Sequence, residues 1–558
     1  MMCNLKNIVL TILSSCFLAS ALAQLENSGS QFLKPFKAKL LKSHKAEATP
    51  LLPHMDDSSN RELNYVVPTR LVEIQYPDPK IRTKNYDKEP PPKHYRIYSK
   101  IGIGYPIAPY IGLSYHSNAS DKIKYGLGFR HHSGRGDLAF QNFHNNEAHL
   151  FATYYGNQLA IGGDLEFNFD GTHFYGFNQN TRDTIAPTKQ DVYQRFINIY
   201  ANIHAFNGTS NKGHFNYRGA LSFDIFSDRY QASELTVAPK FEMEKFFGEN
   251  RKMPLKIDLG LHLNRFRDSI SADTVPRTRL IGYLHPTFGL KLPRIKAKLG
   301  GNLGVSEGEF FIYPDLELEA SLFKGQLNVY GGWTGRIRSN TFHSLTDYNP
   351  FIVSAMNMRH SKWQELYAGV RGNIQGIAYN LKVGYALTKD LPLFLNDSLS
   401  AYDRFVVLYD TVNIFNIRGS LDFKLINNLR LLTTIGLNTY RTKAYAKAYH
   451  LPSLETNITL IYQLHLGKQS RNQNILDLKA EFFLNSGVPY FDEVLRQDKV
   501  LAGLFDLNLG ASYYFTEKIG LFVDINNIVN NKNQRWHRYP QIGFNVMIGA
   551  VIKFNTRP

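Results

Sequence analysis

The sequence predicts an all-β protein, a transmembrane antiparallel β-barrel of about 22 strands that follows a short and mostly extended N-terminal segment. Three observations predict it: strands in which apolar and polar residues alternate, charges in the middle of those strands, and connections of alternating length. The 558 residues include 33 Tyr, 38 Phe and 41 Gly, with 20% charged residues and a net charge of +17. After the first two dozen residues no apolar run reaches the roughly 18 residues of a membrane-spanning helix, so a helical membrane protein is excluded.

The alternation extends over residues 95–554. Residues 256–264 place Ile257, Leu259, Leu261 and Leu263 on one face and polar or charged residues on the other. A period of two residues is the signature of a β-strand. The strands are roughly 12 to 16 residues long, whereas strands of soluble proteins commonly have about 5–6. The same pattern returns at 315–320, 326–329, 380–384, 506–510 and 544–554.

Charged residues occupy the middle of these strands. A sheet in a lipid bilayer must close on itself to satisfy its backbone, so its outer face is apolar and its lumen is polar. A soluble β-propeller would need a repeat of about 40–50 residues, and none is found. The expected lumenal charges are Lys256, Asp258, Glu317, Lys382, Asp422, Lys479, Asp506 and Asp524.

The connections alternate between short turns and long loops, as in outer-membrane barrels. An even number of strands would place both ends of the barrel on the periplasmic side. Short turns are expected near 118–121, 156–157, 293–294, 324–325, 427–428 and 516–518. Long loops are expected near 133–144, 170–190, 268–277, 340–361, 389–407, 486–500 and 529–539.

Residues 1–23 have the form of a signal peptide, with Lys6, an apolar core at 8–18 and small residues before Gln24. A competing interpretation is a lipoprotein signal with lipid attached at Cys16. The only cysteines are Cys3 and Cys16, so cleavage before Gln24 would leave no thiol and no disulfide.

Residues 24–94 form a Pro- and Lys-containing extension, expected to be periplasmic or lumenal, and residues 95–558 form the barrel. The lysine block at 34–45 contains no acidic residue. It is either a solvated basic linker or a short amphipathic helix.

The last strands resemble those of a known family. Residues 511–530 include Leu521, Phe522, Asp524, Asn526 and Asn527, followed by Tyr539, Pro540 and a closing strand at 548–554. This pattern resembles the final strands of TonB-dependent receptors. Phe554 resembles the terminal aromatic residue that the barrel-assembly machinery recognises. The expected first strands, residues 98–110 and 124–133, resemble a subgroup of receptor-like barrels from Bacteroidota.

The sequence departs from that family before the barrel. Residues 24–94 contain nothing similar to the conventional plug domain, and no convincing TonB-contacting box lies near Gln24. Barrels of about 22 strands are normally plugged. We therefore expect the lumen to be closed by residues 24–94, by the loops near 340–361 and 389–407, or by a partner protein.

No residue is predicted to be catalytic, to bind a cofactor or to bind a metal, and no cofactor is expected. His131 and His132 are adjacent in a strand and point to opposite faces, so they cannot chelate one metal together. The tripeptide Arg135, Gly136 and Asp137 is too short to predict adhesion. No local catalytic motif is present, which favours a non-enzyme.

The positive charge is consistent with anionic lipopolysaccharide at the loops, an anion-preferring lumen, or charge dispersed over lumen and loops. Nucleic acid is not an expected partner. The predicted location is the outer membrane of a Gram-negative bacterium of the Bacteroidota. The predicted partners are outer-membrane lipids, the barrel-assembly machinery through Phe554, and other outer-membrane proteins, surface lipoproteins or TonB.

Two functions remain open. The first is solute passage or a receptor role across the outer membrane, in which inward-facing residues such as Lys382 and Asp422 tune passage. The alternative is a non-transporting accessory or scaffold barrel of a larger complex for secretion or barrel assembly.

Overall fold

The computed structural model describes residues 95–554, except for 107, 121, 178–186, 208–214, 249–251, 269–275, 355, 398–403, 427 and 467–473. For residues 118–120 and 324 only the backbone is described. The chain separates into two units, Met1–Glu89 and Pro90–Pro558, and the second contains the barrel. The predicted signal peptide (1–23) and extension (24–94) lie outside the described residues.

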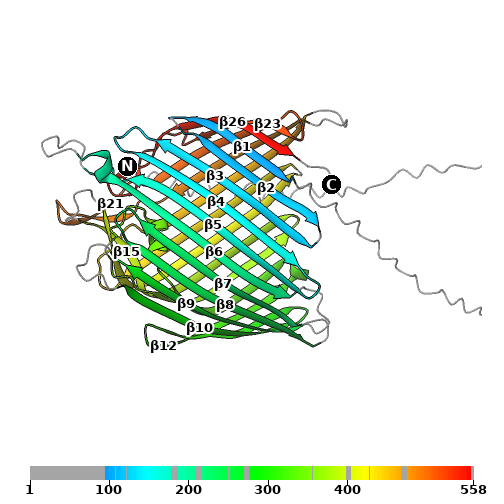
Figure 1. Cartoon of the computed structure of the whole chain (residues 1–558). Coiled ribbons are helices and arrows are strands. Elements are labelled where there is room, and N and C mark those ends of the chain that lie inside the picture. Colours follow the sequence, from blue (N-terminus) through cyan, green and yellow to red (C-terminus); the bar gives the residue numbers. More distant parts are fainter. Residues whose placement is uncertain are drawn as a thin grey trace, which may run out of the picture. The chain divides into compact units, whose positions relative to one another are not determined.

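Twenty-two strands form one antiparallel sheet (Figure 1). They are β1 (Ile97–Tyr105), β2 (Tyr110–Ser120), β3 (Ile123–Arg135), β4 (Asn142–Tyr155), β5 (Leu159–His173), β6 (Tyr193–Asn207), β7 (Phe215–Asp228), β8 (Ser233–Phe247), β9 (Met253–Arg267), β10 (Arg277–Lys291), β11 (Ile295–Ser306), β12 (Glu309–Leu322), β13 (Leu327–Arg338), β14 (Ser361–Ile374), β15 (Ile377–Asn396), β16 (Phe405–Ile426), β17 (Leu429–Thr442), β18 (Leu454–Leu466), β19 (Asn474–Asn485), β22 (Leu504–Tyr514), β23 (Ile519–Asn526) and β26 (Asn545–Phe554).

Seven short elements lie in the connections. They are the helices α2 (Lys189–Val192) and α3 (Phe342–Tyr348), the 3₁₀ turn η2 (Phe323–Gly325), and two small hairpins made by β20 (Pro489–Asp492) with β21 (Gln497–Val500) and by β24 (Gln534–Trp536) with β25 (Tyr539–Pro540). No helix in the described part of the chain has the length and apolar character needed to cross a membrane.

The sheet closes into a barrel because the last strand pairs with the first. Ile97 lies opposite Phe554, and the ladder between β1 and β26 continues to Tyr105 opposite Val546. Each other strand pairs with its neighbours along the ring, β19 with β22 and β23 with β26 included. The predicted antiparallel barrel of about 22 strands, closed by the strand that ends at Phe554, is confirmed.

The two faces of the wall differ as the alternation predicts. In β9, Leu259, Leu261 and Leu263 expose 50%, 48% and 41% of their surface on the outer face, whereas Asn264 between β8 and β10 is fully buried on the inner face. Apolar side chains facing outward suit a lipid environment, in which every backbone group is already paired within the sheet.

The predicted mid-strand charges lie on the inner face, and most of them pair there. The pairs that are open to lumenal water contribute little to stability, so their main effect is to make the lumen polar. The pairs are Lys256 with Asp258 (3.1 Å), Glu317 with Arg371 (3.1 Å), Lys382 with Glu365 (2.7 Å), Asp422 with Arg430 (2.5 Å), Lys479 with Glu481 (2.7 Å) and Asp524 with Lys100 (2.9 Å).

The two rims of the barrel differ in the length of their connections. The turn rim carries the start of β1, the end of β26 and connections of two to seven residues. The loop rim carries the long connections, including 174–192, 339–360, 486–503 and 527–544. Three short connections at 106–109, 229–232 and 307–308 also lie on the loop rim. Apart from these three, the alternation of short and long connections is confirmed, as is the position of both barrel ends on one rim.

Two predicted segments need correction. Most of the loop expected at 389–407 is strand, because β15 continues to Asn396, β16 begins at Phe405, and a bulge between Thr388 and Leu391 lets the hairpin extend past its neighbours. Residues 98–110 do not form a continuous strand, because a turn at 106–109 separates β1 from β2. In β15 the bulge and the apolar run at 391–395 interrupt the alternation inside a continuous strand, whereas at 106–109 the alternation continues through a turn. The alternation therefore does not locate strand ends.

Gly102 and Gly549 lie opposite each other at the seam between β1 and β26. A Cβ atom on Gly549 would lie 2.0 Å from the carbonyl oxygen of Ile101 and 2.6 Å from the Cα of Gly102. The two backbones therefore approach each other as closely as only glycine allows. By contrast, a Cβ on Gly419 in β16 would meet only Leu381 Cδ1, at 3.9 Å.

Gly549→Ala is expected to destabilise the barrel by about 1–3 kcal/mol, because overpacking of this size shifts the closing backbone pair. The urea midpoint of unfolding in detergent micelles, followed by tryptophan emission, measures the change. Gly419→Ala is the matched control and should stay within about 0.5 kcal/mol of the wild type. Equal midpoints for the two variants would contradict a tight seam.

Candidate functional site

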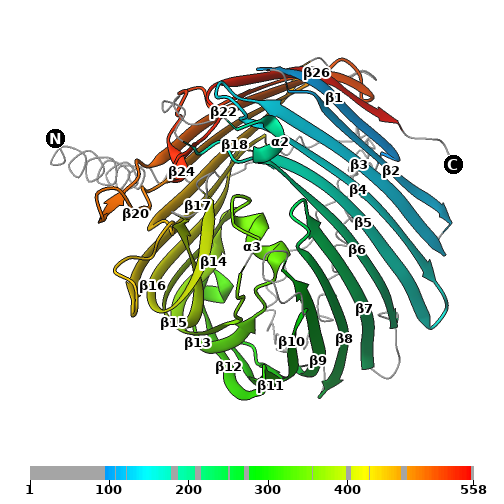
Figure 2. The same cartoon turned by 60° about the vertical axis from the view of Figure 1, so that its left-hand side comes forward.

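The connection 339–360 enters the barrel and carries α3 inside it (Figure 2). Thr341 begins the helix with a capping box, in which its side chain accepts from the backbone of Ser344 and the Ser344 hydroxyl accepts from the backbone of Thr341. The backbone N–H of Asn349 closes the last turn by donating to Leu345 at 2.9 Å. The local sequence therefore supports a short helix without help from lipid or water.

Buried polar contacts attach this connection to the wall at β7, β8 and β10. The Phe342 backbone N–H donates to the Glu234 carboxylate, and the Ser354 hydroxyl donates to the Asp228 carboxylate. The Arg279 guanidinium donates to the Asn340 carbonyl at 2.9 Å. Glu234 and Asp228 expose only 2% and 6% of their surface. Removal of either carboxylate would leave a buried donor unpaired, so these contacts fix the position of α3.

His343 adds a charged contact on the same side. Its Nδ1 lies 2.9 Å from Asp224 Oδ2, and its ring stacks on Phe226 with centroids 4.5 Å apart. Burial lowers the pKa of His343, but the hydrogen bond and charge of Asp224 outweigh it and raise that pKa above its usual value. The histidine therefore tends to hold a proton and an ion pair with the wall.

The other end of the connection attaches to β16. The Val353 N–H donates to the Phe405 carbonyl at 2.8 Å, and the Phe405 N–H donates to the Phe351 carbonyl at 2.9 Å. β8 and β16 are eight strands apart in a ring of 22. The connection 339–360 therefore crosses the lumen from one wall to a nearly opposite one.

The larger of the two buried apolar clusters in the described part of the chain forms around this crossing. We call it the mouth cluster: Phe174, Val192, Phe196, Phe226, Ala232, Phe266, Phe342, Leu345, Phe351, Ile352, Met356, Met358, Phe394, Phe405, Trp536 and Tyr539. Its residues come from β6, β7, β9, β15, β16 and four connections of the loop rim. Full burial of one such large side chain contributes about 1.5–3 kcal/mol, so the cluster as a whole strongly favours a closed mouth.

His450 joins the connection 443–453 to this cluster. It is fully buried; its Nδ1 lies 2.8 Å from the Phe394 carbonyl, and its Nε2 accepts from the His537 backbone N–H at 3.3 Å. Its ring stacks on Trp536 with centroids 5.4 Å apart. Burial lowers the pKa of His450 to about 3, so the ring is neutral and can both donate and accept.

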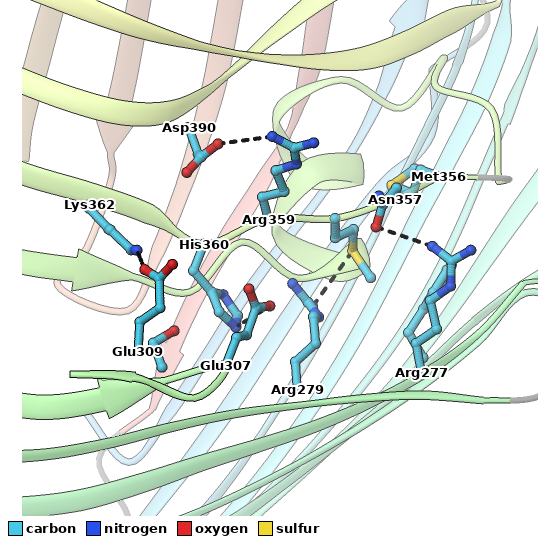
Figure 3. Close-up of a pocket in the computed structure, with 13 residues that line it drawn as sticks. Arg277, Arg279, Glu307, Glu309, Met356, Asn357, Arg359, His360, Lys362 and Asp390 are labelled. Carbon is cyan, nitrogen blue, oxygen red and sulfur yellow. Dashed lines mark hydrogen bonds and ion pairs between the residues drawn. The ribbon is translucent and has the colours of Figure 1, made fainter. Parts of the chain in front are cut away.

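A rim chamber of about 360 Å³ lies between the connection 339–360 and the edges of β10, β12 and β15 (Figure 3). Two of its positive charges are paired with acids, because Arg359 lies 3.3 Å from Asp390 and Lys362 pairs with Glu309. His360 lies in its wall, 3% exposed, with Nε2 3.7 Å from Glu307. Burial and the charge of Arg279 lower the pKa of His360 to about 3, so this contact is not an ion pair at neutral pH.

Two larger chambers adjoin α3. The acidic chamber, about 700 Å³, lies between α3 and β4–β7 and is lined by Glu166, Asp170, Asp224 and Asp347. The basic chamber, about 630 Å³, lies between α3 and β13–β18 and contains Arg336, Arg338, Lys382 and Arg418 with Glu365 and Glu455. The lumen therefore presents opposite charges on two sides of α3.

The structure places the residues that the sequence singled out. Lys382 lies in the basic chamber, as predicted for an inward residue, whereas Asp422 pairs with Arg430 nearer the turn rim. His131 contacts Asn146, and His132 packs against Tyr110 and Phe143, so the two rings face opposite sides as predicted. Among the described residues no group of acids, histidines and cysteines is arranged to hold a metal ion.

Of the closures considered from the sequence, the long loop near 340–361 does fold into the lumen. Residues 24–94 lie outside the described residues. The wall acids Asp228 and Glu234, which hold α3, were not predicted. Their only sequence signal is an inward carboxylate near a strand end, which many lumenal acids share.

Comparison with known proteins gives the fold its context. No protein-family model matches the chain, and no curated protein matches it. Solved structures do match. The FrpB iron transporter from Neisseria meningitidis aligns with a TM-score of 0.63 at 10% identity over 83% of this chain and 82% of that one. The siderophore receptor PirA from Acinetobacter baumannii aligns with a TM-score of 0.62 at 10% identity over 82% and 80%.

The pyoverdine receptor FpvA from Pseudomonas aeruginosa gives a TM-score of 0.62 at 10% identity over 84% of this chain and 79% of that one. At such low identity the similarity concerns the fold. This chain has the barrel fold of outer-membrane siderophore receptors. The predicted resemblance to TonB-dependent receptors is confirmed at that level.

Acid is expected to loosen the mouth. Burial lowers the pKa of His360 and His450 to about 3 and that of His537 to about 4, from an ordinary value of 6.5. Below about pH 6.5 an opened mouth therefore binds more protons than the closed one. Closure is fully stable above that pH and loses about 1.4 kcal/mol per pH unit per histidine as the pH falls.

Amide hydrogen exchange in 339–360 and 443–453, corrected for intrinsic rates, measures this loss between about pH 6.5 and 4. His343 does not contribute to it, because a raised pKa keeps that histidine protonated as the pH falls. In His450→Gln the pH dependence should become shallower. A slope unchanged in that variant would rule out His450 as a source of the effect.

Proposed function

We propose that this protein is a gated receptor of the outer membrane that passes a solute through its lumen, with the mouth cluster as the gate. The observation that carries the proposal is the apolar cluster formed by loop-rim connections inside a polar barrel. A scaffold barrel has no need of chambers in its lumen or of a closure that can be removed. A solute passage needs the chambers and the closure.

The closure supports regulated rather than free diffusion. The mouth cluster combines stacked rings, such as Phe351 on Tyr539 with centroids 3.8 Å apart, with buried carboxylates that hold α3. Opening would expose apolar surface and unpair these groups together. We infer that opening requires a bound solute or an energised partner, and TonB is the partner that the resemblance of the last strands suggests.

The cellular setting is part of the proposal. We propose that residues 1–23 direct export, that the barrel assembles through its last strand ending at Phe554, and that it lies in the outer membrane of a Gram-negative bacterium of Bacteroidota type. Outer-membrane lipids would then cover the apolar outer face. The neighbours FrpB, PirA and FpvA are an iron transporter and siderophore receptors, which supports a role in solute uptake.

Replacement of residues 342–353 by a short Gly-Ser linker is expected to open the lumen. Conductance across a planar bilayer should rise by roughly tenfold or more, because a barrel of 22 strands encloses a wide space when nothing fills it. Replacement of residues 493–496, the exposed tip of the β20–β21 hairpin on the same rim, by Asn-Gly is the matched control. It should leave conductance unchanged.

An unchanged conductance in the 342–353 replacement, with the barrel folded, would show that this connection is not the gate. Purification of the tagged protein from outer membranes in mild detergent tests the accessory alternative. A stoichiometric complex with secretion or barrel-assembly proteins, together with unchanged uptake on deletion, would replace the transport proposal with that alternative.

A further inference from the structure

The basic chamber contains arginines that have no acidic partner. In β13, Val329 and Trp333 expose 42% and 46% of their surface on the outer face, so Arg336 and Arg338 alternate onto the inner face. In β16 the outward Phe415 likewise places Arg418 inside. Among the described residues none of the three arginines makes an ion pair or a hydrogen bond, although all three line the chamber.

This contrasts with three other arginines inside the barrel. Arg371 pairs with Glu317 and Glu319, Arg430 pairs with Asp422, and Arg359 in the rim chamber pairs with Asp390 (Figure 3). Those positive charges are neutralised by the wall. The three arginines of the basic chamber are left with their hydrogen-bond donors directed at a cavity.

The acids of the chamber do not neutralise them. Glu365 is occupied by Lys382 at 2.7 Å and by the Asn416 amide at 2.9 Å. Among the lining residues this leaves one acid, Glu455, and three arginines. The chamber therefore keeps an excess of two positive charges. An unpaired guanidinium carries five donors in a planar fork that fits a carboxylate or phosphate group.

The three arginines lie at two depths in the lumen. Arg336 and Arg338 are two residues apart on one strand, so their Cα atoms are about 7 Å apart. Following the register from Arg336 through Trp363 and Thr388 leads to Val412 on β16. Arg418 is six residues further along β16, about 20 Å nearer the turn rim. The pair thus lies beside α3, and Arg418 lies deeper in the lumen.

Aromatic side chains lie beside Arg336 and Arg338. The Arg336 guanidinium lies over the Trp363 ring, 5.4 Å from its centroid. Tyr348 of α3 accepts a hydrogen bond from Arg535 at 2.8 Å and faces the same chamber. Such rings supply an apolar surface beside the charged groups, which is the usual composition of a site for an organic ligand. A volume of about 630 Å³ lies within the usual size range of such sites.

We propose that the basic chamber binds an organic solute bearing carboxylate or phosphate groups, first at Arg336 and Arg338 beside Trp363 and then at Arg418. This names the substrate class of the proposed passage and rests on that function for its biological role, although binding itself does not. The acidic chamber beyond α3 would repel the same solute, so the bound anion is confined to one side of the lumen.

Tryptophan emission offers a direct test, because the chain contains only three tryptophans. Trp333 faces outward and Trp536 is buried in the mouth cluster, so Trp363 is the one tryptophan that lines the chamber. In a Trp333→Phe background, the full-length protein in detergent is titrated with citrate, with pyrophosphate and with the neutral sugar raffinose. Citrate and pyrophosphate distinguish a carboxylate from a phosphate ligand.

We expect a saturable change in emission with citrate or pyrophosphate that weakens as NaCl is raised, and none with raffinose. The double variant Arg336→Gln/Arg338→Gln should raise the Kd at least about tenfold, which corresponds to about 1.4 kcal/mol. Arg218→Gln is the matched control. Arg218 is a lumenal arginine of β7 that stacks on Phe206 and lines a different cavity.

The proposal is overturned if neither anion changes the emission, or if the folded double variant binds as tightly as the Arg218→Gln control. If the double variant does not fold, the salt dependence of anion binding by the parent protein tests the proposal. Binding that does not weaken as NaCl is raised would show that the arginines do not hold the anion. Arg418 is tested in the protein that carries the 342–353 replacement. There Arg418→Gln should shift the reversal potential in a KCl gradient in the direction of lower anion selectivity. Anion binding without any uptake would reject the proposed passage and keep the site.

Discussion

The structure depends on the hydrogen-bonded closure of one sheet. A strand edge left open in lipid would expose a row of unpaired N–H and C=O groups, each costing several kcal/mol. β26 pairs with β1 over nine residues, from Ile97 to Tyr105, and so removes the last edge. Two glycines, Gly102 and Gly549, let the backbones approach at this seam. Because the wall is complete without its side chains, those side chains are free to be apolar outside and charged inside.

The long connections of the closed barrel explain why the mouth cluster can form inside a lumen that carries many charges. The wall at mid-height is lined by ion pairs, which cannot form a dry core. At the loop rim, however, the connections are long enough to fold back and cover one another. Loop aromatics such as Phe342 and Phe351 meet wall aromatics such as Phe226 and Phe405 there. Buried carboxylates on β7 and β8 position α3, so the mouth is closed by both apolar burial and directed hydrogen bonds.

The position of α3 then divides the charge of the lumen. On one side acids dominate and His343 pairs with Asp224, and on the other side arginines outnumber the acids. Within a low-dielectric wall such an imbalance acts over longer distances than at a protein surface. A gate that separates two regions of opposite potential is able to select a solute by charge as well as by size.

The sequence by itself determined the barrel, its strand number, the inward charges such as Lys382 and the closing strand at Phe554, because a period of two residues and the placement of charges within it are local properties of each strand. It did not locate strand ends, as the hairpin of β15 and β16 shows, because a bulge shifts the alternation by one residue inside a continuous strand. It suggested that the loop near 340–361 could close the lumen, but not that Glu234 and Asp228 hold it. Only the tertiary structure decided which arginines lack a partner, because ion pairs such as Lys382 with Glu365 join strands whose register the sequence does not state.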